Sequence, residues 1–213
     1  MRAATSGADW RAAATELAGR DGVMAALHER HGAPSIGRGV RAQDRFEVLA
    51  RSIAYQQLAG RAAATIWGRV IAAVGDPVTP GSVLATPVEE MRGAGLSGAK
   101  TAALVDLATK CAEHSVRLER LGHLDDRAVI DHLTIVRGIG PWTAQMFLLF
   151  DLNRLDVWPA GDYGVRAGYA RAFGLPEHPT ERQMDALGEP YSPYRSVLAW
   201  WCWRETDTVT PDS

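Results

Sequence analysis

The chain contains little cysteine, little lysine and no long apolar run. Its two cysteines, Cys111 and Cys202, cannot build a disulfide framework, and no Cys-x-x-Cys or His-x-x-x-His spacing indicates a metal site. No stretch approaches the roughly 18 consecutive apolar residues that span a membrane, and residues 1–19 lack the layout of a secretory signal. We therefore expect a cytoplasmic protein, without membrane contact, whose chemistry is performed by side chains.

Strand-like alternation of apolar and polar residues is also absent over any useful length. The dominant period of three to four predicts short helices, separated by glycine- and proline-rich joints such as residues 75–81 and 174–179. The expected helices cover residues 9–18, 21–31, 43–57, 60–74, 87–94, 98–114, 126–136, 141–150, 163–173, 180–188 and 193–204. The sequence thus predicts an all-α protein.

Excess positive charge is missing as well. The formal net charge is −2, which argues against a nucleic-acid partner because phosphate binding is largely electrostatic. A local basic surface can nevertheless coexist with a neutral total, and backbone amides at a helix N-terminus bind phosphate without side-chain charge. Charge alone therefore leaves the partner open.

A glycine-rich break interrupts the helical pattern between residues 126 and 150. Gly138 supplies the backbone angles that end one helix, and Pro141 fits the first turn of the next. Ile139 can anchor the turn between the two helices, while the bare helix N-terminus beyond it can hold an anion such as a DNA phosphate. The alternative is an ordinary joint in which the glycines only reverse the chain.

The segment 137–144, RGIGPWTA, is followed by Asp162 in a Gly/Pro-rich continuation, LNRLDVWPAGDYGV. This combination resembles the helix-hairpin-helix DNA glycosylase superfamily. Segments 51–70, 94–108 and 192–204 are similar to the corresponding parts of its 3-methyladenine DNA glycosylases. The likeness covers the chain from about residue 40 to residue 204.

The resemblance implies a two-lobed helical fold with the active site in the cleft between the lobes. We expect one lobe from residues 1–50 and 160–213, and a central lobe from residues 51–159 that contains the hairpin at about 126–150. The implied partner is double-stranded DNA that contains damaged bases, bound by a monomer. In a bacterium the protein would associate with the nucleoid.

Asp162 is the candidate catalytic residue. It precedes a predicted helix, so taken alone it is best explained as an N-cap that accepts the helix's own amides. The resemblance implies that its carboxylate faces the sugar of an extruded nucleotide, where it stabilises the oxocarbenium-like transition state and positions the attacking water. A carboxylate acts more strongly on such a cation in a site screened from water.

The residue before Thr143 distinguishes reaction types within the family. Strand-cleaving members carry there a lysine that forms a Schiff base with the sugar, whereas this chain has Trp142. We therefore expect a monofunctional enzyme that leaves an abasic site. The resemblance assigns Trp142 to the base pocket, where its ring can stack on a cationic alkylated base, and core packing is the alternative. Trp158 and Tyr163 flank Asp162 and are further candidates for the pocket.

An enzyme that acts on a base inside duplex DNA rotates the nucleotide out, and something fills the gap. By resemblance, Gln57 and Leu58 form this intercalating wedge, with Gln56 nearby as a polar support. A plain polar helix end is the alternative for each of them.

The hairpin and one more helix start supply the candidate DNA contacts. The resemblance assigns Gly138, Ile139, Gly140 and Thr143 of the hairpin to the sugar–phosphate chain. Ser97 is a natural N-cap, and Lys100 falls in the first turn after it, where a cation opposes the helix dipole. A phosphate bound there would explain that placement, and a solvated surface lysine is the alternative.

No organic cofactor is implied, and we expect no catalytic metal. The iron–sulfur cysteine loop of endonuclease III-like members would follow the second lobe, but this chain has only Cys202 there, so no cluster is expected. As in relatives, a monovalent cation can be held at the hairpin by backbone carbonyls near Thr134, Val136 and Ile139.

The expected activity is hydrolysis of the N-glycosidic bond of alkylated purines in base-excision repair, with 3-methyladenine as the substrate and 7-methylguanine as a further candidate. An alkylated base is a cationic leaving group, so no strong general acid is required. The alternatives are a glycosylase for oxidised, deaminated or mismatched bases, and a non-catalytic helix-hairpin-helix DNA-binding module. A helical scaffold without any nucleic-acid role is a third possibility.

Overall fold

The computed structural model describes residues 6–36, 39–58 and 60–206. Within these ranges the chain forms helices and turns but no strand, which confirms the predicted all-α class. None of the helices in the described ranges has the length and apolar composition needed to cross a membrane.

The chain divides into two compact units that are discontinuous in sequence. The terminal unit comprises Met1–Gly39 and Gln145–Ser213, and the central unit comprises Val40–Ala144. These boundaries differ from the expected ones at 50/51 and 159/160. The helix that begins at residue 45 packs against helices of the central unit and therefore belongs to that unit. The buried Phe150 ring stacks on Trp203, so the segment around Phe150 belongs to the terminal unit.

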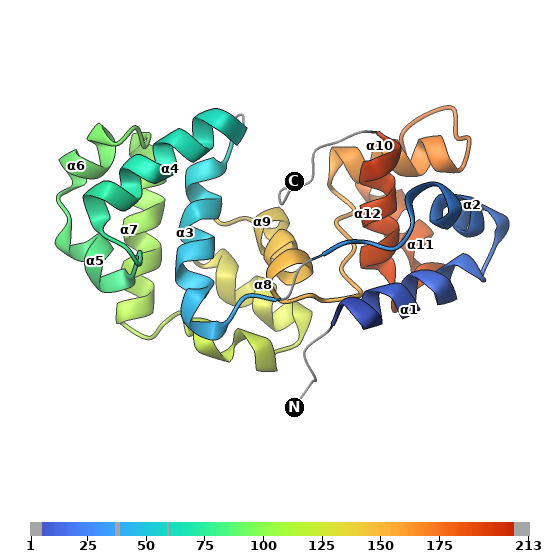
Figure 1. Ribbon diagram of the computed structural model, residues 1–213, viewed down its shortest axis with the longest axis horizontal. Coiled ribbons are helices and arrows are strands. Elements are labelled where there is room, and N and C mark those ends of the chain that lie inside the picture. Colours follow the sequence, from blue (N-terminus) through green and yellow to red (C-terminus); the bar gives the residue numbers. More distant parts are fainter. Residues whose placement is uncertain (1–5, 37–38, 59, 207–213) are drawn as a thin grey trace. The chain divides into compact units, whose positions relative to one another are not determined.

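The central unit is built around α7, which packs against both α3 and α5 (Figure 1). Ser97 caps α7, and Leu104 and Leu107 on its buried face lie in the core of the unit. The helices of this unit are α3 (Arg45–Tyr55), α4 (Gly60–Val74), α5 (Pro80–Ala85), α6 (Val88–Gly93), α7 (Gly98–Ala112) and α8 (Asp126–Thr134), with 3-10 turns η1 (Ala42–Asp44) and η2 (Leu118–His123). Helix α9 (Pro141–Met146) contains the second boundary.

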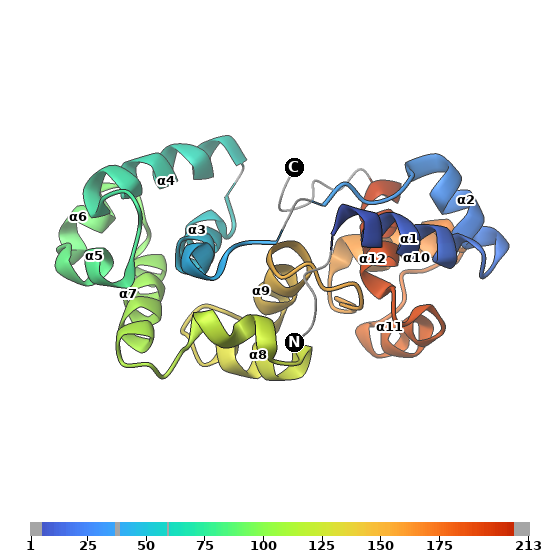
Figure 2. The ribbon, with the colours of Figure 1, turned by 60° about the horizontal axis from the view of Figure 1, so that its bottom comes forward.

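The terminal unit is organised around α12, whose Trp201, Cys202 and Trp203 are all buried. Helix α12 packs most extensively against α10 and also contacts α1 and α2 (Figure 2). The elements of this unit are α1 (Gly7–Ala18), α2 (Gly22–His31), the π-helical turn η3 (Phe147–Asp151), α10 (Tyr163–Ala172), α11 (Glu181–Gly188), the 3-10 turn η4 (Glu189–Tyr191) and α12 (Arg195–Glu205).

Several short elements, among them α5, η2 and η4, were not expected from the sequence. Helix α5 falls partly within the predicted joint at 75–81, because Thr79 forms a capping box with Ser82 and Pro80 occupies the first helical position. The 3-10 turn η2 falls between two predicted helices. Conversely, the helix expected over 43–57 ends at Tyr55, where Gln56 turns to extended backbone with ψ 132°.

Helices α10 and α12 approach so closely that only glycine fits at one contact. A Cβ atom on Gly168 would lie 1.9 Å from the carbonyl oxygen of Cys202, far inside van der Waals contact. The missing side chain therefore sets the spacing of the two helices.

Gly168→Ala is expected to lower the free energy of unfolding by about 1–3 kcal/mol or more, because the helices must separate to admit the methyl group. Gly68→Ala is the matched control. Gly68 also lies within a helix, α4, but a Cβ there meets nothing within 4 Å. That variant should gain about 0.5–1 kcal/mol of stability. Urea titrations of both proteins check the pair, and equal effects would contradict the close approach of α10 and α12.

Candidate functional site

The turn between α8 and α9 has the predicted hairpin geometry. Gly138 adopts a left-handed backbone with φ +78°, and a Cβ atom there would lie 3.0 Å from the Cβ of Ala103. Both the conformation and the close approach to α7 favour glycine. Ile139 is buried, its N–H donates to the carbonyl of Val136, and α9 begins at Pro141. The first-turn amides of such a helix have no acceptor within it, so this end can face an anion.

The Asp106 carboxylate on α7 holds the hairpin by a hydrogen bond to its backbone. Asp106 accepts the backbone N–H of Arg137 at 2.7 Å and also pairs with Lys110. Burial acts to raise the pKa of Asp106, but the hydrogen bonds from Lys110 and from the Arg137 amide outweigh it and leave that pKa below its usual range. Asp106 therefore stays ionised and holds the turn against α7.

The turn after α3 is tied directly to the hairpin. The side-chain amide of Gln56 donates to the carbonyl of Gly138 at 2.9 Å. Gln57 has a left-handed backbone with φ 58°, which is uncommon for a residue other than glycine. Gln57 and Leu58 are both exposed, Leu58 by 37%. Gln56 thus braces the turn, and the two residues after it project from the tip.

Lys100 and Ser97 make structural contacts at the start of α7. The Lys100 ammonium donates to the carbonyl of Ala54 at 2.8 Å, close to the end of α3, and burial lowers its pKa. The Ser97 hydroxyl accepts the Lys100 N–H as the N-cap of α7. Lys100 therefore braces the end of α3 with one of its three N–H donors, and its contact with a phosphate stays a prediction.

Asp162 is the N-cap of α10, as the sequence predicted. Its Oδ1 atom accepts the N–H of Val165 at 2.9 Å. The same oxygen accepts the indole N–H of Trp203 on α12 at 2.8 Å. The sequence carries no signal for this contact because it depends on how α10 and α12 meet.

The aromatic candidates divide into exposed and buried groups. Trp142 is 45% exposed and Tyr163 is 69% exposed, so both rings can be reached from solvent. Trp158 is only 8% exposed, its ring packs edge-on against Tyr169, and its indole N–H donates to the carbonyl of Met184. The structure therefore corrects the expectation for Trp158, which belongs to the interior of the terminal unit.

Thr143 is also buried, although it was grouped with the DNA contacts. Its side chain cannot meet a sugar–phosphate chain from that position, so any contact of this residue would be made by its backbone amide. The sequence pattern could not separate these two possibilities because it fixes only the place of Thr143 in the first turn of α9.

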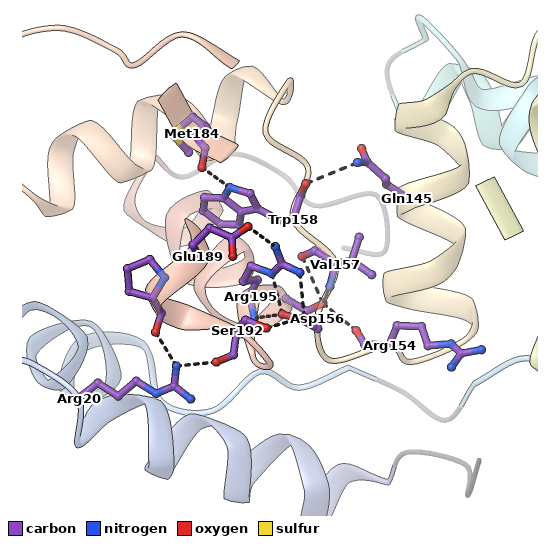
Figure 3. A network of polar contacts seen from close by, with 12 residues as sticks. Arg20, Gln145, Arg154, Asp156, Val157, Trp158, Met184, Glu189, Ser192 and Arg195 are labelled. Carbon is purple, nitrogen blue, oxygen red and sulfur yellow. Dashed lines mark hydrogen bonds and ion pairs between the residues drawn. The ribbon is translucent and has the colours of Figure 1, made fainter. Parts of the chain in front are cut away.

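The loop that leads to Asp162 is fastened to the start of α12 (Figure 3). The guanidinium of Arg195 donates two hydrogen bonds to Asp156, at 2.7 and 2.8 Å, and the Ser192 hydroxyl donates another. Burial acts to raise the pKa of Asp156, but these bonds leave it below its usual range. The Ser196 hydroxyl accepts the N–H of Val157 and donates to the carbonyl of Arg154.

In the part of the chain that the structure describes, no group of three or more His, Cys, Asp or Glu side chains could hold a metal ion. Burial raises the pKa of the Cys202 thiol, so Cys202 does not supply a reactive thiolate.

Comparison with known proteins agrees with this geometry. Residues 50–193 match a family model described as HhH-GPD superfamily base excision DNA repair protein. DNA-3-methyladenine glycosylase 1 of Schizosaccharomyces pombe is 34% identical over 170 residues, which cover 78% of this chain and 75% of that protein. DNA-3-methyladenine glycosylase of Saccharomyces cerevisiae is 32% identical over 203 residues, which cover 79% and 69%.

Solved structures show the same similarity. The 3-methyladenine DNA glycosylase Mag1 of Schizosaccharomyces pombe, in complex with abasic DNA, superposes with a TM-score of 0.80 at 30% identity, covering 95% of this chain and 98% of that one. A DNA-3-methyladenine glycosidase from Bacillus halodurans gives a TM-score of 0.82 at 28% identity, covering 92% and 89%.

Asp106→Ala is expected to destabilise the hairpin by about 1 kcal/mol, because the Arg137 N–H loses its acceptor. Hydrogen exchange at the Arg137 amide should become faster. Asp131→Ala is the control, since Asp131 makes an exposed ion pair with Arg127 one turn away and its loss should cost about 0.5 kcal/mol or less. Unchanged exchange at Arg137 in the first variant would contradict the role of Asp106.

Proposed function

Because the chain belongs to the HhH-GPD superfamily of base excision DNA repair proteins, we propose that it is a DNA glycosylase that hydrolyses the N-glycosidic bond of alkylated purines. The single observation that carries this proposal is a carboxylate, Asp162, fixed at the N-terminus of α10 by donors from two helices. Similarity to proteins named DNA-3-methyladenine glycosylase favours 3-methyladenine as the substrate, with 7-methylguanine as a further candidate.

The partner is double-stranded DNA, gripped through the hairpin. Backbone amides at Gly138, Gly140 and the first turn of α9 supply donors for a phosphate, which agrees with a chain of net charge −2. Arg137 and Arg92 line a groove of about 480 Å³ in the central unit. The Asp106 carboxylate also lines this groove, so its two arginines leave a modest excess of positive charge beside the hairpin.

Extrusion of the damaged nucleotide requires a wedge. The side chains of Gln57 and Leu58 are the best candidates, because they are exposed at the tip of a turn that Gln56 braces against the hairpin. A braced tip resists displacement when it enters the base stack, so that insertion can offset the few kcal/mol that unstacking costs. The hydrogen bond of Gln56 joins this wedge to the element that grips the phosphates.

Asp162 acts on the sugar once the base is out of the stack. As the C1′–N bond breaks, the electron pair of that bond goes to the base and neutralises the positive charge that alkylation created. Positive charge then develops at C1′, where a fixed negative carboxylate stabilises it and orients a water molecule for attack. Because the leaving group is already cationic, the site requires no strong general acid.

Exposed aromatic rings suit a cationic base. Trp142 and Tyr163 both present accessible ring surface. An electron-rich indole stacked on an alkylated purine gains about 0.5–2 kcal/mol from cation–π attraction. This gain is absent for the neutral, unmodified base, and it therefore contributes to selectivity for damage.

Strand cleavage is not expected, since it requires an amine that forms a Schiff base with the sugar. The position before Thr143 is Trp142, and Lys100 and Lys110 are the only lysines of the chain. Lys100 donates to the carbonyl of Ala54 and Lys110 pairs with Asp106. Neither ammonium is available as a nucleophile in this arrangement.

A monovalent cation at the hairpin remains a prediction. The carbonyl of Val136 accepts one hydrogen bond, from Ile139, and a carbonyl oxygen has two lone pairs, so a ligand role is compatible with the turn. With Thr134 and Ile139 it would hold the ion by backbone oxygens, and the ion would stiffen the hairpin. A monomeric state and a cytoplasmic location likewise remain predictions.

Asp162→Asn is expected to lower the single-turnover rate of base release from a methylated duplex by about 100- to 1000-fold, because the charge at C1′ loses its stabilising partner. Affinity for the duplex should be retained. Asp185→Asn, which changes an exposed carboxylate on α11, is the control and should leave the rate unchanged. A panel of alkylated, deaminated and oxidised duplexes measures the specificity, and binding of every duplex without any base release would favour a DNA-binding module instead.

The wild-type protein should leave abasic duplex DNA uncut, and borohydride should trap no covalent protein–DNA adduct. Denaturing gels of the abasic product, with and without alkali, check both points. A trapped adduct that disappears in Lys100→Arg or Lys110→Arg would show that one of these lysines is a Schiff-base nucleophile after all.

A further inference from the structure

Trp203 contacts the candidate catalytic carboxylate through a single hydrogen bond. Its side chain is only 2% exposed, and its ring stacks on Phe150 with centroids 5.8 Å apart and planes 26° apart. From this fixed ring the indole N–H reaches Oδ1 of Asp162 at 2.8 Å. Together with the Val165 N–H, it gives one carboxylate oxygen two donors from two helices. Rotation of the carboxylate about its own bond would break both.

Two other buried indoles of the terminal unit show that a carboxylate is not required to satisfy an N–H group. Trp158 donates to the carbonyl of Met184, and Trp201 donates to the carbonyl of Gly32 at 2.8 Å. A backbone carbonyl is therefore a sufficient acceptor for a buried indole N–H. Of these three tryptophans, Trp203 alone donates to a charged side chain, and that side chain already has the N-cap bond that α10 needs.

Helix α12 holds the catalytic segment at two points. Arg195 and Ser196, at its start, bind residues 154–157 of the loop that leads to Asp162 (Figure 3). Trp203 lies seven residues after Ser196, which is two helical turns, so both side chains lie on one face of the helix. Gly168 allows α10 to approach α12 closely enough for the second contact. Helix α12 therefore determines both the path of the loop and the orientation of the Asp162 carboxylate at the end of that loop.

We infer that Trp203 is a positioning residue for the glycosylase reaction, and that its indole N–H keeps the Asp162 carboxylate in the orientation that the developing charge at C1′ requires. This inference rests on the proposed function. Without the indole N–H, one of the two donors that hold Oδ1 is lost and the Val165 N–H alone opposes rotation of the carboxylate, so bond cleavage slows while binding of the duplex does not change.

Trp203→Phe tests the inference, and Trp201→Phe is the matched control. Both positions are buried on α12, and both substitutions remove an indole donor and similar volume. The first should lower the single-turnover rate of 3-methyladenine release at saturating enzyme by about 10- to 100-fold, the range expected for a misplaced catalytic group. The second should leave this rate at the wild-type value. Duplex affinity, measured by fluorescence anisotropy, should be unchanged in both.

Replacement of Trp203 by 3-benzothienylalanine removes the N–H while it preserves the shape of the ring, and it decides the matter if the phenylalanine variant does not fold. A slow rate with unchanged duplex affinity in this protein supports the inference. A wild-type rate overturns it, as does an equal loss of rate in the Trp201 and Trp203 variants. If the wild-type protein releases no base from any alkylated duplex, the proposed function is contradicted, and the inference about Trp203 is contradicted with it.

Discussion

The close approach of α10 and α12 is the constraint on which the candidate active site depends. Only the absent side chain at Gly168 permits it, because the backbone of Cys202 occupies the space that a Cβ would fill. At this spacing one helix begins with the Asp162 carboxylate and the other supplies an indole that fixes it. The buried rings of Phe150 and Trp203 in turn hold the indole in place. A packing feature of the terminal unit thus determines how the Asp162 carboxylate is held.

In the proposed function, the central unit holds DNA although the formal net charge of the chain is −2. The hairpin offers backbone N–H groups as donors. Charged side chains support the backbone instead: Asp106 accepts the Arg137 N–H, and Lys100 donates to a carbonyl at the end of α3. Gln56 then joins the exposed turn at Gln57 to the carbonyl of Gly138. We propose that these rigid backbone positions, rather than a high net positive charge, direct the contact to DNA.

Features that are encoded locally could be predicted from the sequence, and features that depend on tertiary contacts could not. The helices, the left-handed Gly138, the buried Ile139 and the N-cap role of Asp162 all follow from periodicity and from the backbone preferences of glycine, proline and aspartate. The contact of Lys100 with the carbonyl of Ala54 could not be predicted, because a first-turn cation can turn either to an anion or to a neighbouring carbonyl. Trp158 was misjudged because proximity in sequence to Asp162 does not decide on which side of the chain a ring packs. The Trp203 contact joins residues that lie far apart in the chain, so no local pattern could reveal it.

The central claim is that the Asp162 carboxylate faces the sugar carbon at which positive charge develops. Its most direct test compares the affinity of the wild-type protein for two duplexes that differ only in an abasic-site analogue, a cationic pyrrolidine ring or a neutral tetrahydrofuran ring. We expect the cationic analogue to bind more tightly by about tenfold or more, equivalent to about 1.4 kcal/mol, and this preference to be lost in Asp162→Asn. Equal affinity of the wild-type protein for the two duplexes would contradict it.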